Sequence, residues 1–88
     1  MIDVALCPDG SAVLMAHGDA DDVTVRVVGD SVEITDCGGR VLAHLRGAGH
    51  ALLSMLRSTG TVDVVLAGAG GIKGFAAPVS TVDGGCYA

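Results

Sequence analysis

Residues 23–46 read VTVRVVGDSVEITDCGGRVLAHLR, and this stretch carries the clearest structural signal in the chain. It contains three runs of alternating residues, which are separated by Gly29-Asp30 and Gly38-Gly39. Glycine readily adopts the positive φ angles of two-residue hairpin turns, so each pair predicts a tight turn between antiparallel strands. The stretch therefore predicts a three-stranded antiparallel meander.

The register of this meander follows from taking each glycine pair as the loop. Across the first turn, Val25 then faces Ile34 and Arg26 faces Glu33. Across the second turn, Ile34 faces Ala43 and Glu33 faces His44. Both registers place the aliphatic residues on one side, and a slip of one residue would expose them. The other side is predicted to be a polar sheet face that contains Arg26, Glu33, His44 and Arg46.

The rest of the chain gives weaker signals. Residues 2–7 and 11–17 flank Pro8-Asp9-Gly10, a turn sequence, and predict a hairpin that is apolar on both sides. Residues 48–58 have the apolar spacing of a helix, and residues 61–67 read as a buried strand. A right-handed crossover would place that strand parallel to a meander strand.

The predicted fold class is α+β. It comprises an N-terminal β-hairpin, a three-stranded antiparallel meander, one α-helix packed on the sheet, a return β-strand and a glycine-rich C-terminal tail. Residues 1–67 form the single domain and residues 68–88 the tail, in which 79–82 is a candidate short strand. The helix is predicted to meet the valine side of the meander through Leu52, Met55 and Leu56.

Composition points to an interaction surface. Half of the 88 residues are hydrophobic, yet Phe75 and Tyr87 are the only aromatic ones, so the core must be aliphatic. A chain this small has a modest core, and apolar side chains left outside it usually mark an interface. The predicted interface residues are Val13, Met15, Phe75, Val79, Val82 and Tyr87.

Charge and cysteine usage exclude several classes of partner. The formal net charge is −5, and residues 1–22 hold five aspartates and no lysine or arginine, which argues against nucleic-acid binding. The N-terminus lacks the features of a signal peptide, and no apolar run reaches the roughly 20 residues of a membrane span. Three widely spaced cysteines suit a reduced, cytoplasmic chain better than a disulfide framework.

No motif predicts a cofactor or a metal. Cys7, His17, Cys37 and His44 are spaced too widely along the chain for the ligand pairs of a zinc site. The aspartates of residues 19–22 lack the later ligands of a calcium loop. The glycines around Lys73 lack the following serine or threonine and the helix of a phosphate loop.

The leading hypothesis is a non-enzymatic structural or protein-interaction module that self-associates or docks on a larger assembly, with a coat or virion-type component as one setting. The alternative is a small enzyme or redox protein that uses His44 or Cys86. Two minor alternatives are a toxin-neutralising partner and a modified-peptide precursor with a processed tail.

Overall fold

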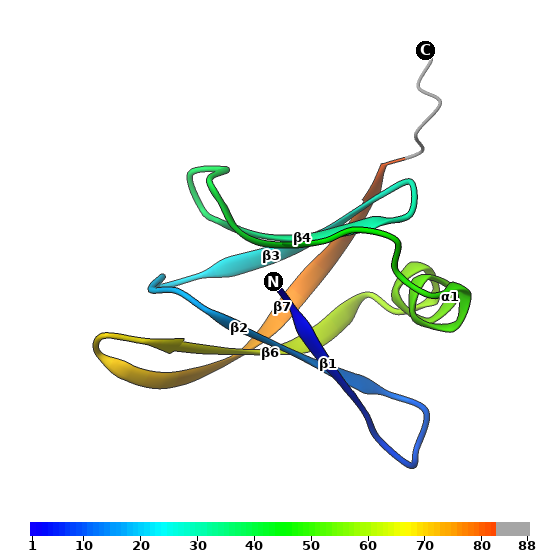
Figure 1. Ribbon diagram of the computed structural model, residues 1–88, viewed down its shortest axis with the longest axis horizontal. Helices are drawn as coiled ribbons and strands as arrows, with labels where there is room; N and C mark the ends of the chain where they lie inside the picture. Colours follow the sequence, from blue (N-terminus) through cyan, green and yellow to red (C-terminus); the bar gives the residue numbers. More distant parts are fainter. Residues whose placement is uncertain (83–88) are drawn as a thin grey trace.

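The computed structural model describes residues 1–82, and these residues form one curled, mixed sheet of seven strands with a single helix (Figure 1). The strands lie in the order β1-β2-β6-β7-β3-β4-β5. Their bounds are β1 Asp3–Leu6, β2 Ala12–His17, β3 Val23–Val28, β4 Ser31–Asp36, β5 Val41–Leu45, β6 Thr61–Gly68 and β7 Gly71–Val82, and helix α1 spans His50–Ser58.

This architecture corrects the predicted fold class. Residues 1–82 are mostly β, with seven strands in one sheet, and do not form a three-stranded meander with a helix, a return strand and a glycine-rich tail. The main error concerns residues 71–78, because they belong to β7, the longest strand in the sheet. The candidate short strand at residues 79–82 is the last part of the same strand. Tail residues 83–88 lie outside the described part of the chain.

The meander itself is confirmed with the predicted pairing. Val25 lies opposite Ile34, and Glu33 lies between Arg26 on β3 and His44 on β5. The second turn is wider than predicted, since the register shifts between Ile34 and Thr35. Asp36 explains the shift: its Oδ1 accepts hydrogen bonds from the backbone N–H groups of Gly38 and Arg40, both at 2.9 Å.

The N-terminal hairpin is also confirmed, with Val4 opposite Leu14 and Leu6 opposite Ala12. The partner of the return strand was predicted wrongly. Strand β6 runs parallel to β2 of the hairpin, and its other neighbour is β7, so it touches no meander strand in the sheet.

Strand β7 joins the two halves of the sheet. Its first part pairs antiparallel with β6, and its last part, from Val79 to Val82, pairs parallel with β3. Figure 1 shows β7 crossing from the side of β6 to the side of β3. Pro78 lies where one ladder ends and the other begins, a position that tolerates a residue without an N–H better than the middle of a ladder does.

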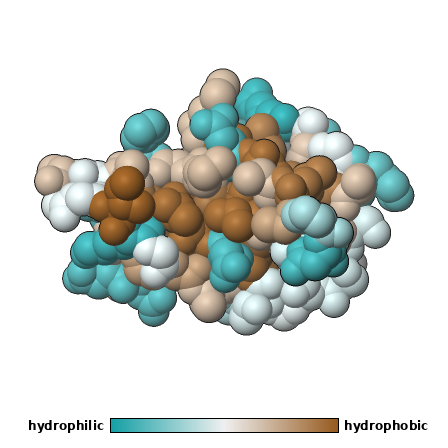
Figure 2. All heavy atoms as spheres, turned by 90° about the horizontal axis from the view of Figure 1, so that it is seen from below, coloured by the Kyte–Doolittle hydropathy of each residue, from teal (hydrophilic) through white to brown (hydrophobic). Residues whose placement is uncertain are grey.

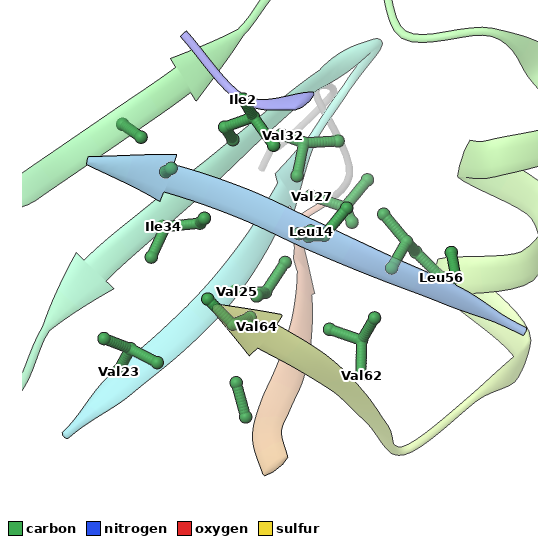
Figure 3. Packing of buried hydrophobic residues seen from close by; sticks show 14 of the residues in the cluster. Ile2, Leu14, Val23, Val25, Val27, Val32, Ile34, Leu56, Val62 and Val64 are labelled. Atoms are coloured by element: carbon green, nitrogen blue, oxygen red, sulfur yellow. The ribbon is translucent and has the colours of Figure 1, made fainter. Parts of the chain in front are cut away.

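The core lies on the concave inner side of the sheet and is aliphatic, as composition predicts (Figure 3). Leu14, Val25 and Val64 come from three different strands and are fully buried. Helix α1 adds Leu52 and Leu56, as predicted, and also Leu53, whereas Met55 is only partly buried. Arg57, near the end of the helix, donates a hydrogen bond from Nη2 to the carbonyl oxygen of Gly29 in the first meander turn at 2.7 Å.

Gly68 is required where the connection between β2 and β3 packs on the end of β6. The N–H of Gly18 donates to the carbonyl oxygen of Ala67 at 3.1 Å, and the N–H of Ala69 donates to Asp19 Oδ2 at 3.3 Å. A Cβ on Gly68 would lie 2.6 Å from the carbonyl oxygen of Gly18 and would overlap the Asp19 carboxylate.

We therefore expect Gly68→Ala to lower the free energy of unfolding by about 1–3 kcal/mol, the usual cost of overpacking a tight contact. Gly70→Ala is the matched control, because a Cβ there meets no atom within 4 Å. Urea unfolding followed by circular dichroism measures both variants. Equal stabilities would show that the connection does not pack on β6 in this way.

The central place of β7 is tested by two neighbouring alanines. Ala77 is 1% exposed and Ala76 points to the outer side, so Ala77→Asp buries an unpaired charge and Ala76→Asp does not. We expect Ala77→Asp to lower the free energy of unfolding by more than about 3 kcal/mol, while Ala76→Asp stays folded. Thermal denaturation compares them, and similar melting temperatures would contradict the position of β7.

Candidate interaction face

The outer side of β1, β2, β6 and β7 carries mainly apolar side chains. Alternation along β2 buries Leu14 and turns Val13 and Met15 outward, and alternation along β6 buries Val64 and turns Val65 outward. The strand registers bring these outward residues side by side. We call this surface the apolar face, and its members are Ala5, Val13, Met15, Val65, Ala67, Ile72 and Ala76.

The apolar face is hollowed. One row across the four strands runs Asp3, Met15, Val65 and Gly74. Because Gly74 has no side chain and a Cβ there would meet nothing within 4 Å, the surface beside Val65 is open. Two shallow depressions of about 450 and 350 Å³ share Val65 as a lining residue.

Two large side chains project beside these depressions. Ile72 is 77% exposed and Met15 is 38% exposed, although isoleucine and methionine are usually buried. Figure 2 views the molecule from the side of β6 and shows a band of apolar residues interrupted by single polar groups. A continuous apolar area on the surface of a folded domain is typical of a binding site.

The polar groups on this surface are mainly acidic. Asp3 and Asp63 lie in the rows of the apolar face and are exposed, and His17 lies beside Ala67. The ion pairs among residues 1–82 join Arg26 to Glu33, Arg40 to Asp36 and Lys73 to Asp21. Neither Asp3 nor Asp63 takes part in these pairs, so both carboxylates remain available to a partner.

The outer side of the other half of the sheet is polar. A row runs Ser80, Arg26, Glu33 and His44 across β7, β3, β4 and β5. Arg26 Nη1 lies 3.4 Å from Glu33 Oε1, an exposed to half-buried ion pair of the kind that contributes little to stability. One sheet thus presents an apolar outer half and a polar outer half.

The structure separates the residues predicted for an interface. Val13 and Met15 lie on the apolar face, whereas Phe75 and Val79 are partly buried and pack against the core. Phe75 also lines the smaller of the two depressions. Val82 is 40% exposed beside Val28 at the end of β7, away from the apolar face, and Tyr87 lies outside residues 1–82. In the predicted polar sheet face, Arg26, Glu33 and His44 form one row, and Arg46 is exposed just after β5.

Sequence reasoning missed Val65, Ala67 and Ile72. Residues 61–67 were expected to be buried on both sides, and 68–88 were interpreted as a tail. The available signal was the alternation in 71–82, where Phe75, Ala77 and Val79 share one parity. Two glycines in that segment, Gly71 and Gly74, weaken the pattern, because glycine lowers strand propensity.

No described residues form a metal site. Among residues 1–82, no group of three or more histidine, cysteine, aspartate or glutamate side chains is placed to hold an ion. Cys7 and Cys37 are both free thiols, and Cys86 lies outside the described residues. The described part of the chain also contains no helix of the length and apolarity needed to cross a membrane.

Comparison with known proteins found no matching family model, curated protein or solved structure.

The turn between β1 and β2 contains a carboxyl group with a shifted pKa. Ser11 donates to Asp9 Oδ1 from its hydroxyl at 2.6 Å and from its backbone N–H at 3.0 Å. Both hydrogen bonds favour the charged carboxylate, and the bond from the hydroxyl has the larger effect. They lower the pKa of Asp9 below its ordinary value of 3.8.

We expect Ser11→Ala to raise the pKa of Asp9 toward 3.8, as measured by NMR titration of its carboxyl carbon. The pKa of Asp9 is lower in the folded state than in the unfolded state. The hydrogen bonds from Ser11 therefore stabilise the fold above pH 3.8, and this stabilisation is lost as the pH falls through the folded-state pKa. Ser54→Ala on the exposed side of α1 is the control. An Asp9 midpoint unchanged by Ser11→Ala would show that this turn is not held by Ser11.

Proposed function

We propose that this protein is a non-enzymatic protein-interaction module that docks on a partner protein through the apolar face. The observation that carries the proposal is the outward projection of Met15 and Ile72 beside two depressions on a four-stranded apolar surface. Covering such side chains removes apolar area from water, which is the main favourable term in protein association.

Charge favours another protein over a second copy as the partner. A second copy brings a net charge of −5, and most of its cations are engaged internally. Three of the five lysines and arginines form ion pairs, and Arg57 donates to a backbone carbonyl. Asp3 and Asp63 of the apolar face would meet few free cations on a second copy, whereas a partner with basic residues pairs with both.

The position of His44 does not favour the enzyme alternative. His44 lies in a row of polar residues on the outer side of the sheet, next to Glu33 and the edge of the sheet. Both depressions lie on the other half of the sheet, so His44 does not line either of them. A catalytic imidazole needs a concave site that holds substrate against it, and neither of these two depressions places one beside His44.

Site-specific photocrosslinking tests the docking face. A photoreactive amino acid in place of Ile72 is expected to give a discrete crosslinked product in the host cell, because Ile72 is 77% exposed on the apolar face. Val41 is the matched control, since it is also an exposed aliphatic residue, 47% exposed, but lies on β5 in the polar half. The same probe at Val41 is expected to give no such product.

Two further outcomes would overturn the proposal. Equal crosslinking from positions 72 and 41 would show that the apolar face is not a selective docking surface. A crosslinked product of twice the chain mass, together with a dimer in sedimentation-velocity experiments that Ile72→Asp abolishes, would identify a second copy as the partner instead.

A further inference from the structure

The apolar face is too small to hold a stable partner alone. Four strands about 4.8 Å apart and three outward rows about 7 Å apart cover roughly 400 Å². A standard stable interface buries about 800 Å² on each partner. A partner seated on the apolar face therefore needs further contacts next to it, and the adjoining feature is the free edge of β1.

The backbone of β1 presents unpaired groups along this edge. In the hairpin, the N–H of Cys7 donates to the carbonyl oxygen of Ser11 at 2.8 Å, so Cys7 faces β2. Antiparallel ladders alternate, and the backbone groups of Ala5 and Asp3 consequently also face β2. Those of Val4 and Leu6 point away from β2, toward the side where the sheet order ends.

The two edges of the sheet differ in protection. Proteins protect edge strands with bulges, proline or charged side chains. Strand β5 has a register shift against β4, and Arg40 and Arg46 flank it. Strand β1 pairs with β2 without a bulge, contains no lysine, arginine or proline, and has Asp3 as its one charged residue. Its Leu6 is 70% exposed.

We infer that the edge of β1 binds an extended segment of the partner protein, in which basic residues alternate with apolar ones, as an eighth strand of the sheet. The inference rests on the proposed function and specifies how the partner attaches. Hydrogen bonds to Val4 and Leu6 hold the backbone of the segment, which is the usual mode of β-strand addition.

The side chains of β1 define the pattern of that segment. Asp3 points to the outer side, so the neighbouring outward residues of the added strand are basic. Val4 and Leu6 point to the inner side, and an apolar residue beside them covers the exposed part of Leu6. Residues 1–22 hold five aspartates and no lysine or arginine, so the whole hairpin attracts a cationic segment.

The same charges argue against β1 of a second copy as the added strand. Pairing of β1 with β1 of another molecule would bring two hairpins together that each carry Asp3 and Asp9 and no basic residue. Like charges side by side on adjacent strands are destabilising. An added segment with lysine or arginine has the opposite effect.

The probe for this inference is a synthetic octapeptide that alternates lysine and valine, with a glutamate–valine octapeptide as its control. Two-dimensional NMR of the full chain follows the titration at low salt. We expect the lysine peptide to shift the amide signals of Val4 and Leu6 and to slow their hydrogen exchange. The glutamate peptide is expected to shift neither, and added salt should weaken the lysine peptide because it screens exposed charges.

Substitutions in β1 separate backbone pairing from charge attraction. Val4→Pro removes an outward N–H and leaves the bonds to β2, and we expect it to weaken binding roughly 5-fold or more, the worth of one hydrogen bond. Asp3→Asn is expected to weaken binding about 2- to 5-fold, as for an exposed ion pair. Ala5→Pro removes an N–H that faces β2, so it is expected to destabilise the hairpin itself.

Several outcomes would overturn the inference. These are equal binding of the two peptides, shifts on the apolar face without protection of Val4 and Leu6, or a folded Val4→Pro variant with unchanged affinity. If Val4→Pro does not fold, hydrogen exchange in the unmodified chain provides the test. Unchanged exchange of the Val4 and Leu6 amides in the presence of the lysine peptide would then overturn the inference. A negative peptide result together with selective crosslinking from position 72 would reject the edge as the attachment site and leave the proposed function standing.

Discussion

The change of partner along β7 is the constraint on which the rest of the structure depends. Its first part completes the ladder with β6, and its last part completes the ladder with β3, so one strand joins the N-terminal hairpin to the meander. Without β7, each half would expose a row of backbone donors and acceptors and one side of an aliphatic core. Val25 and Val64 are buried against a common core because β7 holds their strands in one curled sheet.

The curled sheet also decides which side chains are available to a partner. All strands contribute to one inner core, and the outer side is left to solvent except where another molecule covers it. On the meander half this outer side is polar and its main charges are paired, as between Arg26 and Glu33. On the other half it is apolar, with carboxylates that take no part in the ion pairs of residues 1–82, and the adjoining edge strand has no bulge. The two halves of a single surface therefore differ in what they can bind.

Much of the local structure was predictable. The hairpin registers follow from alternation and turn residues, which are local signals, and Val25, Ile34 and Ala43 lie where these signals place them. The wider turn at Asp36 was not predicted, because it depends on a side-chain oxygen capturing two backbone N–H groups. Of the apolar face, only Val13 and Met15 were predicted as interface residues, since their outward position follows from the N-terminal hairpin alone.

The sequence by itself determined the registers of the N-terminal hairpin and of the first meander hairpin, the helix and the aliphatic nature of the core. These depend on spacing between residues that are close along the chain. Only the tertiary structure decided that residues 71–82 form a strand and that β6 lies beside β2. The glycines of β7 give that segment little intrinsic preference for a strand, and its conformation is stabilised by hydrogen bonds to two strands that are distant in sequence. The apolar face has the same origin, because Met15, Val65 and Ile72 become neighbours only when β2, β6 and β7 pair.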